Sequence, residues 1–189
     1  MELLQNKILA EGQYLGNGIL KVDSFMNHQI DPQLMKKIGE EFAARFRELK
    51  PTRILTAESS GIAPALLTAI ELSVPLVYAR KSQPVTMKRD PFREKSESHT
   101  HRKAVELIVS TEYLHKDDRV LIIDDFLATA RTILSLVKLV EQSGATLVGI
   151  ASVIEKEFEG GREKIEYLNV PVVSLARIKS FDGDKVNFV

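Results

Sequence analysis

The 189-residue chain is long enough for one domain with a sizeable core, and its apolar fraction of 44% is ordinary for a globular protein. Its 26 Lys and Arg residues balance its 26 Asp and Glu residues, which argues against nucleic acid or anionic lipid as its main partner. Because the chain contains no cysteine, disulfides, thiolate metal ligands and cysteine nucleophiles are excluded.

The first residues, MELLQNKILAEG, predict a helix with Leu4, Ile8 and Leu9 at helical spacing. They lack the basic start and the unbroken apolar block of a signal peptide. No apolar run in the chain approaches the length of a membrane span. We therefore expect a cytoplasmic protein without a membrane partner.

A second helix is predicted from Asp31, a favoured N-cap residue, with Pro32 at its first position. Apolar residues then recur at helical spacing: Leu34, Ile38, Phe42, Phe46 and Leu49. The next elements are a strand (53–58), a helix (65–72) and a strand (75–79), an order typical of a right-handed parallel crossover.

The polar stretch from Arg80 to about Arg102 shows no sustained period and contains two prolines. A compact domain rarely keeps so long an irregular loop without a use. We predict an irregular, flexible lid over about 82–100, with disorder without function as the alternative.

The C-terminal half alternates strands and helices. Residues 105–109 alternate like a half-buried strand, and 119–124, RVLIID, are apolar like a central strand covered on both faces. A helix follows and ends at Gly144, and further strands and a short helix are predicted over 145–155, 160–168, 172–179 and 182–189. We predict a single α/β domain over 1–189, a mainly parallel sheet with helices on both faces.

Ligands of open α/β sheets bind outside the carboxyl ends of the strands. Four predicted strand ends carry polar residues, and parallel strands would bring all four to one rim: ESSG (58–61), Arg80–Lys81, Asp124–Asp125 and Glu155–Lys156.

The Asp124–Asp125 pair is followed by ATART (128–132), where a helix begins. The free backbone N–H groups and the dipole of a helix start can bind an anion. Carboxylates would repel a neighbouring phosphate, so they need another partner, which sugar hydroxyls or magnesium would supply. A polar strand-to-helix turn is the alternative.

Residues Val120 to Thr132 resemble the signature of type I phosphoribosyltransferases, an apolar strand, two acids and an A-T-G-G-T loop, with Ala130 and Arg131 in place of the glycines. From about Leu20 to Val189 the chain is similar to the bacterial xanthine phosphoribosyltransferases. This similarity rests on LKVDSFMNHQIDP (20–32), ESSGIAP (58–64), YARK (78–81) and IEK (154–156).

The resemblance implies the type I phosphoribosyltransferase fold, with a hood from about 1–35 and 155–189. It implies transfer of the phosphoribosyl group of phosphoribosyl pyrophosphate to xanthine, which gives xanthosine 5′-monophosphate and pyrophosphate. It further implies a homodimer, and magnesium carried by phosphoribosyl pyrophosphate near Asp124 and Asp125.

The resemblance also implies residue roles. Asp124 and Asp125 would bind the ribose hydroxyls, directly or through magnesium, and with Arg80 and Lys81 they are the predicted catalytic residues. The 5′-phosphate would bind at Ala128, Thr129, Ala130, Arg131 and Thr132, and pyrophosphate at Ser59, Ser60 and Gly61. In the family, the loop at 58–61 often contains a cis peptide bond without proline. Xanthine would bind at Leu20, Asn27, Lys156 and Phe126.

Physical chemistry agrees with the predicted base site. Leu20 and Phe126 offer an apolar face for a flat purine, although Phe126 suits the core equally well. Asn27 and Lys156 offer donors to the purine oxygens, and a donor at the C2 oxygen would discriminate xanthine from other purines. Hypoxanthine-guanine enzymes usually have an acid where this chain has Ala128.

Three alternatives stay open at this point. The acceptor could be adenine, guanine or hypoxanthine, or the chain could be a regulator that senses phosphoribosyl pyrophosphate without catalysis. A magnesium-dependent receiver or phosphatase built on the Asp pair would leave ATART unexplained. In the same segment, a positive φ at Ala130 would cost on the order of 1 kcal/mol.

Overall fold

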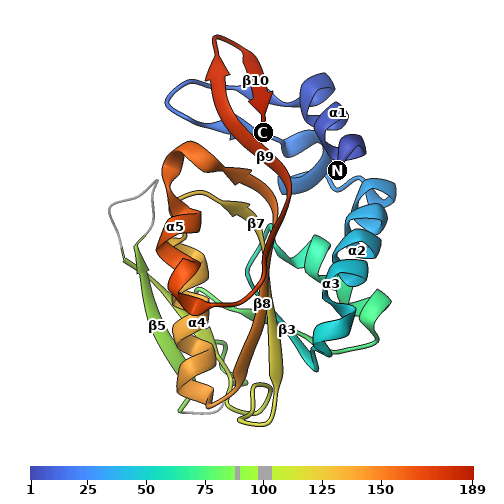
Figure 1. Cartoon of the computed structure of the whole chain (residues 1–189). Coiled ribbons are helices and arrows are strands. Elements are labelled where there is room, and N and C mark those ends of the chain that lie inside the picture. The colour runs from blue at the N-terminus through green and yellow to red at the C-terminus, as the bar shows by residue number, and fades with distance from the viewer. Residues whose placement is uncertain (88–89, 98–103) are drawn as a thin grey trace.

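The computed structural model describes residues 1–87, 90–97 and 104–189, except for the side chains of 96–97 and 104–105. Its centre is a six-stranded sheet in the order β10-β9-β8-β7-β3-β4 (Figure 1). Only β10 runs antiparallel to its neighbour within this sheet, so the prediction of a mainly parallel sheet is confirmed. The strands are β3 (Arg53–Ala57), β4 (Leu76–Ala79), β7 (Arg119–Leu127), β8 (Thr146–Lys156), β9 (Val172–Asp182) and β10 (Lys185–Phe188).

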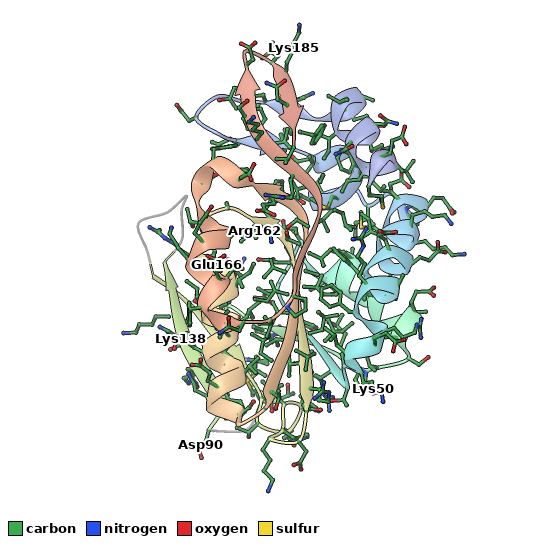
Figure 2. All side chains as sticks on the ribbon, viewed as in Figure 1. Lys50, Asp90, Lys138, Arg162, Glu166 and Lys185 are labelled. Carbon is green, nitrogen blue, oxygen red and sulfur yellow. The ribbon has the colours of Figure 1, made fainter. Side chains whose placement is uncertain are left out.

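Helices cover both faces of the sheet, as predicted. One face carries α2 (Pro32–Phe46) and α3 (Ile62–Leu72), and the other carries α4 (Arg131–Ser143) and the short α5 (Gly161–Ile165) (Figure 1). Two apolar clusters, one on each face, fill the space between the sheet and the helices (Figure 2). None of the helices in the described ranges is long and apolar enough to cross a membrane.

The start of α2 follows the sequence prediction. The Asp31 side chain accepts hydrogen bonds from the backbone N–H groups of Gln33 and Leu34, both at 3.1 Å, and Pro32 occupies the first turn. The helix then buries its apolar stripe against α3, which positions the strand–helix–strand unit β3-α3-β4.

The two chain ends lie side by side at one end of the molecule (Figure 1). They comprise α1 (Glu2–Glu11), the hairpin β1 (Gln13–Tyr14) and β2 (Leu20–Lys21), and the strands β9 and β10 (Figure 1). The Met1 amino group donates to the Leu175 carbonyl, and the Tyr14 ring stacks on Phe181 at 4.2 Å between centroids. These contacts join the two segments from which the hood is predicted, and the boundaries of the hood stay a prediction.

The prediction of an irregular lid over about 82–100 is wrong for one segment. Residues Phe92–Glu97 form a strand, β5, which pairs antiparallel with β6 (Ala104–Val109) in a separate two-stranded sheet. Sequence pattern missed β5 because Phe92 is its only large apolar residue, and the strand depends on pairing with β6. Residues 88–89 and 98–100 of the predicted lid lie outside the described residues.

Candidate active site

The four polar strand ends meet at one rim of the sheet, since β3, β4, β7 and β8 are parallel neighbours. One boundary differs from the sequence prediction: β7 continues past both aspartates to Leu127. Phe126 lies opposite Ile154 and Leu127 opposite Glu155, so the long strand β8 extends the ladder beyond Asp124.

Asp124 is buried and Asp125 is half-buried. Asp124 is 5% exposed, and its Oδ1 accepts the Asp125 N–H at 3.0 Å, while Asp125 Oδ1 accepts the Phe126 N–H at 2.9 Å. Burial, with the Asp125 charge as the next cause, raises the pKa of Asp124 well above its usual range. Burial also raises the pKa of Asp125, against the opposing effect of hydrogen bonds with Asp124 and with the Phe126 N–H. Burial and mutual repulsion thus outweigh the positive charge near the pair, so a bound cation or hydroxyl donors would stabilise its ionised form.

The loop after β3 comes close to this pair. The Glu58–Ser59 peptide bond is cis, as the family resemblance implied. A Cβ at Gly61 would lie 2.2 Å from Thr56 Oγ1 and 3.3 Å from Asp124 Oδ1, so only glycine permits this approach. Through this close approach at Gly61, the loop forms one wall beside the acids.

Two cations follow β4. The Lys81 N–H donates to Glu58 Oε1 at 2.6 Å, which joins the β4 and β3 loops, and the Lys81 charge acts against the rise of the Asp124 pKa. Arg80 Nη1 donates to the Tyr78 hydroxyl at 3.2 Å, while its Nε is buried without a hydrogen-bond acceptor among the described residues. The rim thus combines the buried acids with cations on the neighbouring loop.

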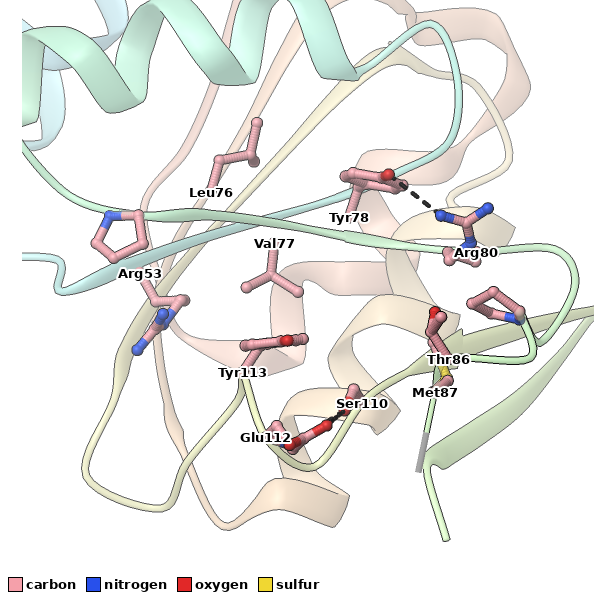
Figure 3. Close-up of a pocket in the computed structure, with 12 residues that line it drawn as sticks. Arg53, Leu76, Val77, Tyr78, Arg80, Thr86, Met87, Ser110, Glu112 and Tyr113 are labelled. Carbon is pink, nitrogen blue, oxygen red and sulfur yellow. Dashed lines mark hydrogen bonds between the residues drawn. The ribbon is translucent and has the colours of Figure 1, made fainter. Parts of the chain in front are cut away.

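A cavity of about 460 Å³ lies beside β4 (Figure 3). Tyr78, Tyr113 and Glu112 line it, together with Arg80, whose guanidinium points toward the Tyr78 hydroxyl. None of the residues that line this cavity is an aspartate. The cavity therefore lies beside the predicted site, and Arg80 is the one predicted catalytic residue that lines it.

The ATART segment forms a tight loop at the start of α4. Ala130 has φ 64° and ψ 11°, in the left-handed region, and is 4% exposed. The helix begins at Arg131, so the N–H groups of its first turn have no acceptor within the helix. Thr129 and Thr132 are partly buried in this loop, whereas Arg131 is exposed. The loop has the backbone form of an anion site, with an alanine where glycine fits with less strain.

The predicted base residues are only partly brought together. Lys156 Nζ lies 5.4 Å from the centroid of the Phe126 ring and 3.4 Å from Glu159 Oε1. Leu20 is 6% exposed in the apolar cluster against which Phe126 packs. Asn27 is exposed at the end of a π-helical turn, Asp23–Asn27, and within the described residues no hydrogen bond or ion pair joins it to Phe126 or Lys156.

Sequence reasoning missed the partners of Glu155. This residue is 1% exposed and accepts two hydrogen bonds from Arg162, at 2.8 and 2.5 Å. The available signal was a carboxylate directly after a buried apolar run, because a buried charge requires a partner. Hydrophobic spacing does not identify that partner.

Comparison with known proteins identifies the family of this site. Residues 26–181 match the phosphoribosyl transferase domain family. The chain belongs to this family. Family members similar along the full chain include xanthine phosphoribosyltransferases of Bacillus cytotoxicus, 50% identical over 100% of this chain and 96% of that protein, and of Geobacillus thermodenitrificans, 51% identical over 100% and 97%.

Solved structures of the family share the fold. An adenine phosphoribosyltransferase from Trypanosoma brucei, in complex with AMP, pyrophosphate and ribose-5-phosphate, is 27% identical with a TM-score of 0.74. The similarity covers 92% of this chain and 79% of that one. The enzyme from Leishmania tarentolae is 26% identical with a TM-score of 0.75, over 92% and 87%. The chain therefore has the type I phosphoribosyltransferase fold.

Proposed function

We propose that the protein transfers the 5-phosphoribosyl group of phosphoribosyl pyrophosphate to xanthine, giving xanthosine 5′-monophosphate and pyrophosphate. The observation that carries this proposal is the pair of buried Asp124 and half-buried Asp125 beside the anion loop 128–132. Xanthine as the acceptor is supported by full-length relatives near 50% identity that bear this activity in their names.

The sugar phosphate binds along the end of β7. The first-turn N–H groups of α4 and the loop 128–132 bind the 5′-phosphate, with Thr129, Arg131 and Thr132 as side-chain donors. Asp124 and Asp125 accept hydrogen bonds from the ribose hydroxyls. A sugar between these groups has its anionic end at the helix start and its hydroxyl groups at the acids.

Magnesium fits the donor set of the site. Two adjacent carboxylates with raised pKa values favour a cation, and carboxylate oxygens are ligands that magnesium accepts. Asp124 and Asp125 would hold it with oxygens of the substrate and water. When bound, magnesium neutralises negative charge on the pyrophosphate.

The pyrophosphate binds on the β3 and β4 side of the rim. Ser59, Ser60 and the Gly61 N–H donate to its oxygens, and Arg80 and Lys81 supply positive charge. The buried Arg80 Nε, without an acceptor among the described residues, supports an anionic ligand here, because a buried donor left unpaired is costly.

Xanthine binds between the Phe126 ring and the N-terminal segment. Phe126 and Leu20 contact its faces, while Lys156 and Asn27 donate to its oxygens. The position of Lys156 Nζ, 5.4 Å from the Phe126 ring centroid, supports this arrangement, since one side chain stacks on the base while the other reaches its edge. An ammonium at the C2 oxygen favours xanthine over hypoxanthine, which has no oxygen there.

Catalysis is mainly a matter of position and charge. A purine ring nitrogen forms a bond to C1 of the ribose while the bond from C1 to the pyrophosphate oxygen breaks, and the purine releases its ring proton. The loops hold both reactants in line, and the cations stabilise the charge that develops on pyrophosphate.

Turnover with each of xanthine, guanine, hypoxanthine and adenine tests the proposal, with magnesium and phosphoribosyl pyrophosphate present. We expect the highest kcat/KM with xanthine. A higher value with another purine would overturn the choice of base. Binding of phosphoribosyl pyrophosphate without product from any purine would favour the sensor.

A homodimer is part of the proposal. Leu66 and Ile70 are 46% and 59% exposed on one face of α3, and Tyr78 is 38% exposed on the edge strand β4. Burial of this apolar surface by a second copy would stabilise a dimer. Light scattering should give the dimer mass for the parent and the monomer mass for Leu66→Glu/Ile70→Glu, and a monomeric parent would contradict it.

A further inference from the structure

The short helix α5 packs directly against the anion loop. A Cβ at Gly161, the first residue of α5, would lie 2.1 Å from the Ala128 carbonyl oxygen and 2.9 Å from the Ala130 nitrogen. Lys164 Nζ lies 3.5 Å from the Thr129 carbonyl oxygen, and Ile165 is buried in the same cluster as Ala130. Gly161 and Lys164 of α5 therefore lie against the consecutive loop residues 128–130.

These contacts set the direction of the loop amides. The Ala128 oxygen lies nearer to the Gly161 Cβ position than the Ala128 carbonyl carbon does, at 2.1 against 2.9 Å, so this carbonyl points toward α5. The Thr129 carbonyl also faces α5 through Lys164. In a planar trans peptide the N–H points opposite to the C=O. The N–H groups of Thr129 and Ala130 consequently point away from α5.

Arg162 fixes α5 in place. Its guanidinium donates to both oxygens of Glu155 on β8, to the Val172 carbonyl at 3.1 Å and to Ser174 Oγ at 3.3 Å, both on β9. Glu155 lies opposite Leu127, the last residue of β7 before the anion loop. One side chain thus connects α5 to two strands at the level where the loop begins.

We propose that Gly161 and Arg162 are positioning residues for the 5′-phosphate of phosphoribosyl pyrophosphate. Arg162 anchors α5, and the close approach at Gly161 holds the carbonyls of the loop so that its amides face the phosphate. Neither residue touches the substrate. The inference rests on the proposed function, because it assumes that the anion at 128–132 is this phosphate.

The test uses Gly161→Ala and Arg162→Lys in steady-state kinetics with both substrates varied. A methyl group at 161 displaces the loop, and lysine cannot reproduce the forked donation to Glu155. We expect KM for phosphoribosyl pyrophosphate to rise about tenfold or more in both variants, because small displacements of a binding group are costly. The KM for xanthine should change by less than about twofold, since Phe126 and Lys156 lie outside the α5 contacts.

Arg53→Lys is the matched control. Arg53 forms a similar partly buried pair with Asp118, at 3.2 Å, but at the opposite end of the sheet. This variant should be destabilised without a change in KM for phosphoribosyl pyrophosphate. If Arg162→Lys and Gly161→Ala behave like this control, α5 has only a structural role and the inference fails.

Calorimetric titration of folded protein with phosphoribosyl pyrophosphate and magnesium separates the two proposals. Binding by the parent with weaker binding by both variants supports the inference. Equal binding by parent and variants overturns the inference and leaves the proposed function standing. No binding by the parent overturns the proposed function itself.

Discussion

Substitution of Ala130 tests two properties of the anion loop, the left-handed backbone at this residue and phosphate binding. Its φ of 64° places an L-residue with a side chain in the left-handed region, which costs about 1–2 kcal/mol. Ala130→Gly removes this cost. It also removes one buried methyl group, worth about 0.8 kcal/mol, and gives the unfolded chain freedom worth about 0.4–1 kcal/mol.

These contributions nearly cancel, so Ala130→Gly should lie within about 1 kcal/mol of the parent. For a chain of this size that corresponds to a shift in Tm of no more than about 4 °C. Ala130→Val keeps the left-handed cost and forces a β-branched side chain into a position that is 4% exposed. Overpacking of this kind costs roughly 1–3 kcal/mol, so this variant should melt clearly lower.

Thermal unfolding followed by circular dichroism measures both variants, and kinetics with xanthine measures their function. Ala130→Gly should keep the parent activity or exceed it, because glycine allows the backbone to approach the phosphate more closely. A loss of more than about 2 kcal/mol in Ala130→Gly, or an Ala130→Val variant as stable as the parent, would refute a left-handed Ala130.

The other predictions concern charge. Asp125→Asn should lower kcat/KM about a hundredfold or more, and full activity would undo the ribose assignment. Asp124→Asn should abolish activity yet raise stability near neutral pH by about 1 kcal/mol. Because the folded protein raises the pKa of Asp124, the parent should lose stability as pH rises from the ordinary aspartate range through this raised pKa. Thermal melting at a series of pH values should show a smaller loss of stability with rising pH in Asp124→Asn than in the parent. Arg162→Met should cost about 3 kcal/mol because it removes both hydrogen bonds to buried Glu155 and leaves it only the longer ion pair with Arg177, at 3.5 Å. Although burial opposes it, Arg162 lowers the pKa of Glu155. The stability that this pair contributes is therefore present above the ordinary glutamate pKa and is lost as pH falls below it. An unchanged denaturation midpoint in Arg162→Met would contradict this prediction.

Local sequence signals predicted the framework well. Asp31 and Pro32 marked the start of α2, and the unbroken apolar runs of β7 and β8 marked strands covered on both faces. These signals succeed because a cap or a hydrophobic run depends mainly on near neighbours in the chain.

Features that depend on distant partners were not predictable in this way. The strand β5 exists through pairing with β6, and β7 extends to Leu127 because β8 is long enough to pair with it. The cis bond at Glu58–Ser59 was implied by the family resemblance and not by any local pattern. The partners of Glu155 and the contact of Gly161 with the anion loop result from three-dimensional packing.

The central claim is transfer of phosphoribosyl to xanthine at the Asp124–Asp125 site. Its most direct test supplies equal concentrations of xanthine, guanine, hypoxanthine and adenine with limiting phosphoribosyl pyrophosphate and magnesium, and identifies the nucleotides by mass spectrometry. The account predicts mainly xanthosine 5′-monophosphate from the parent and almost none from Asp125→Asn. A different nucleotide as the main product, or undiminished product from Asp125→Asn, would contradict it.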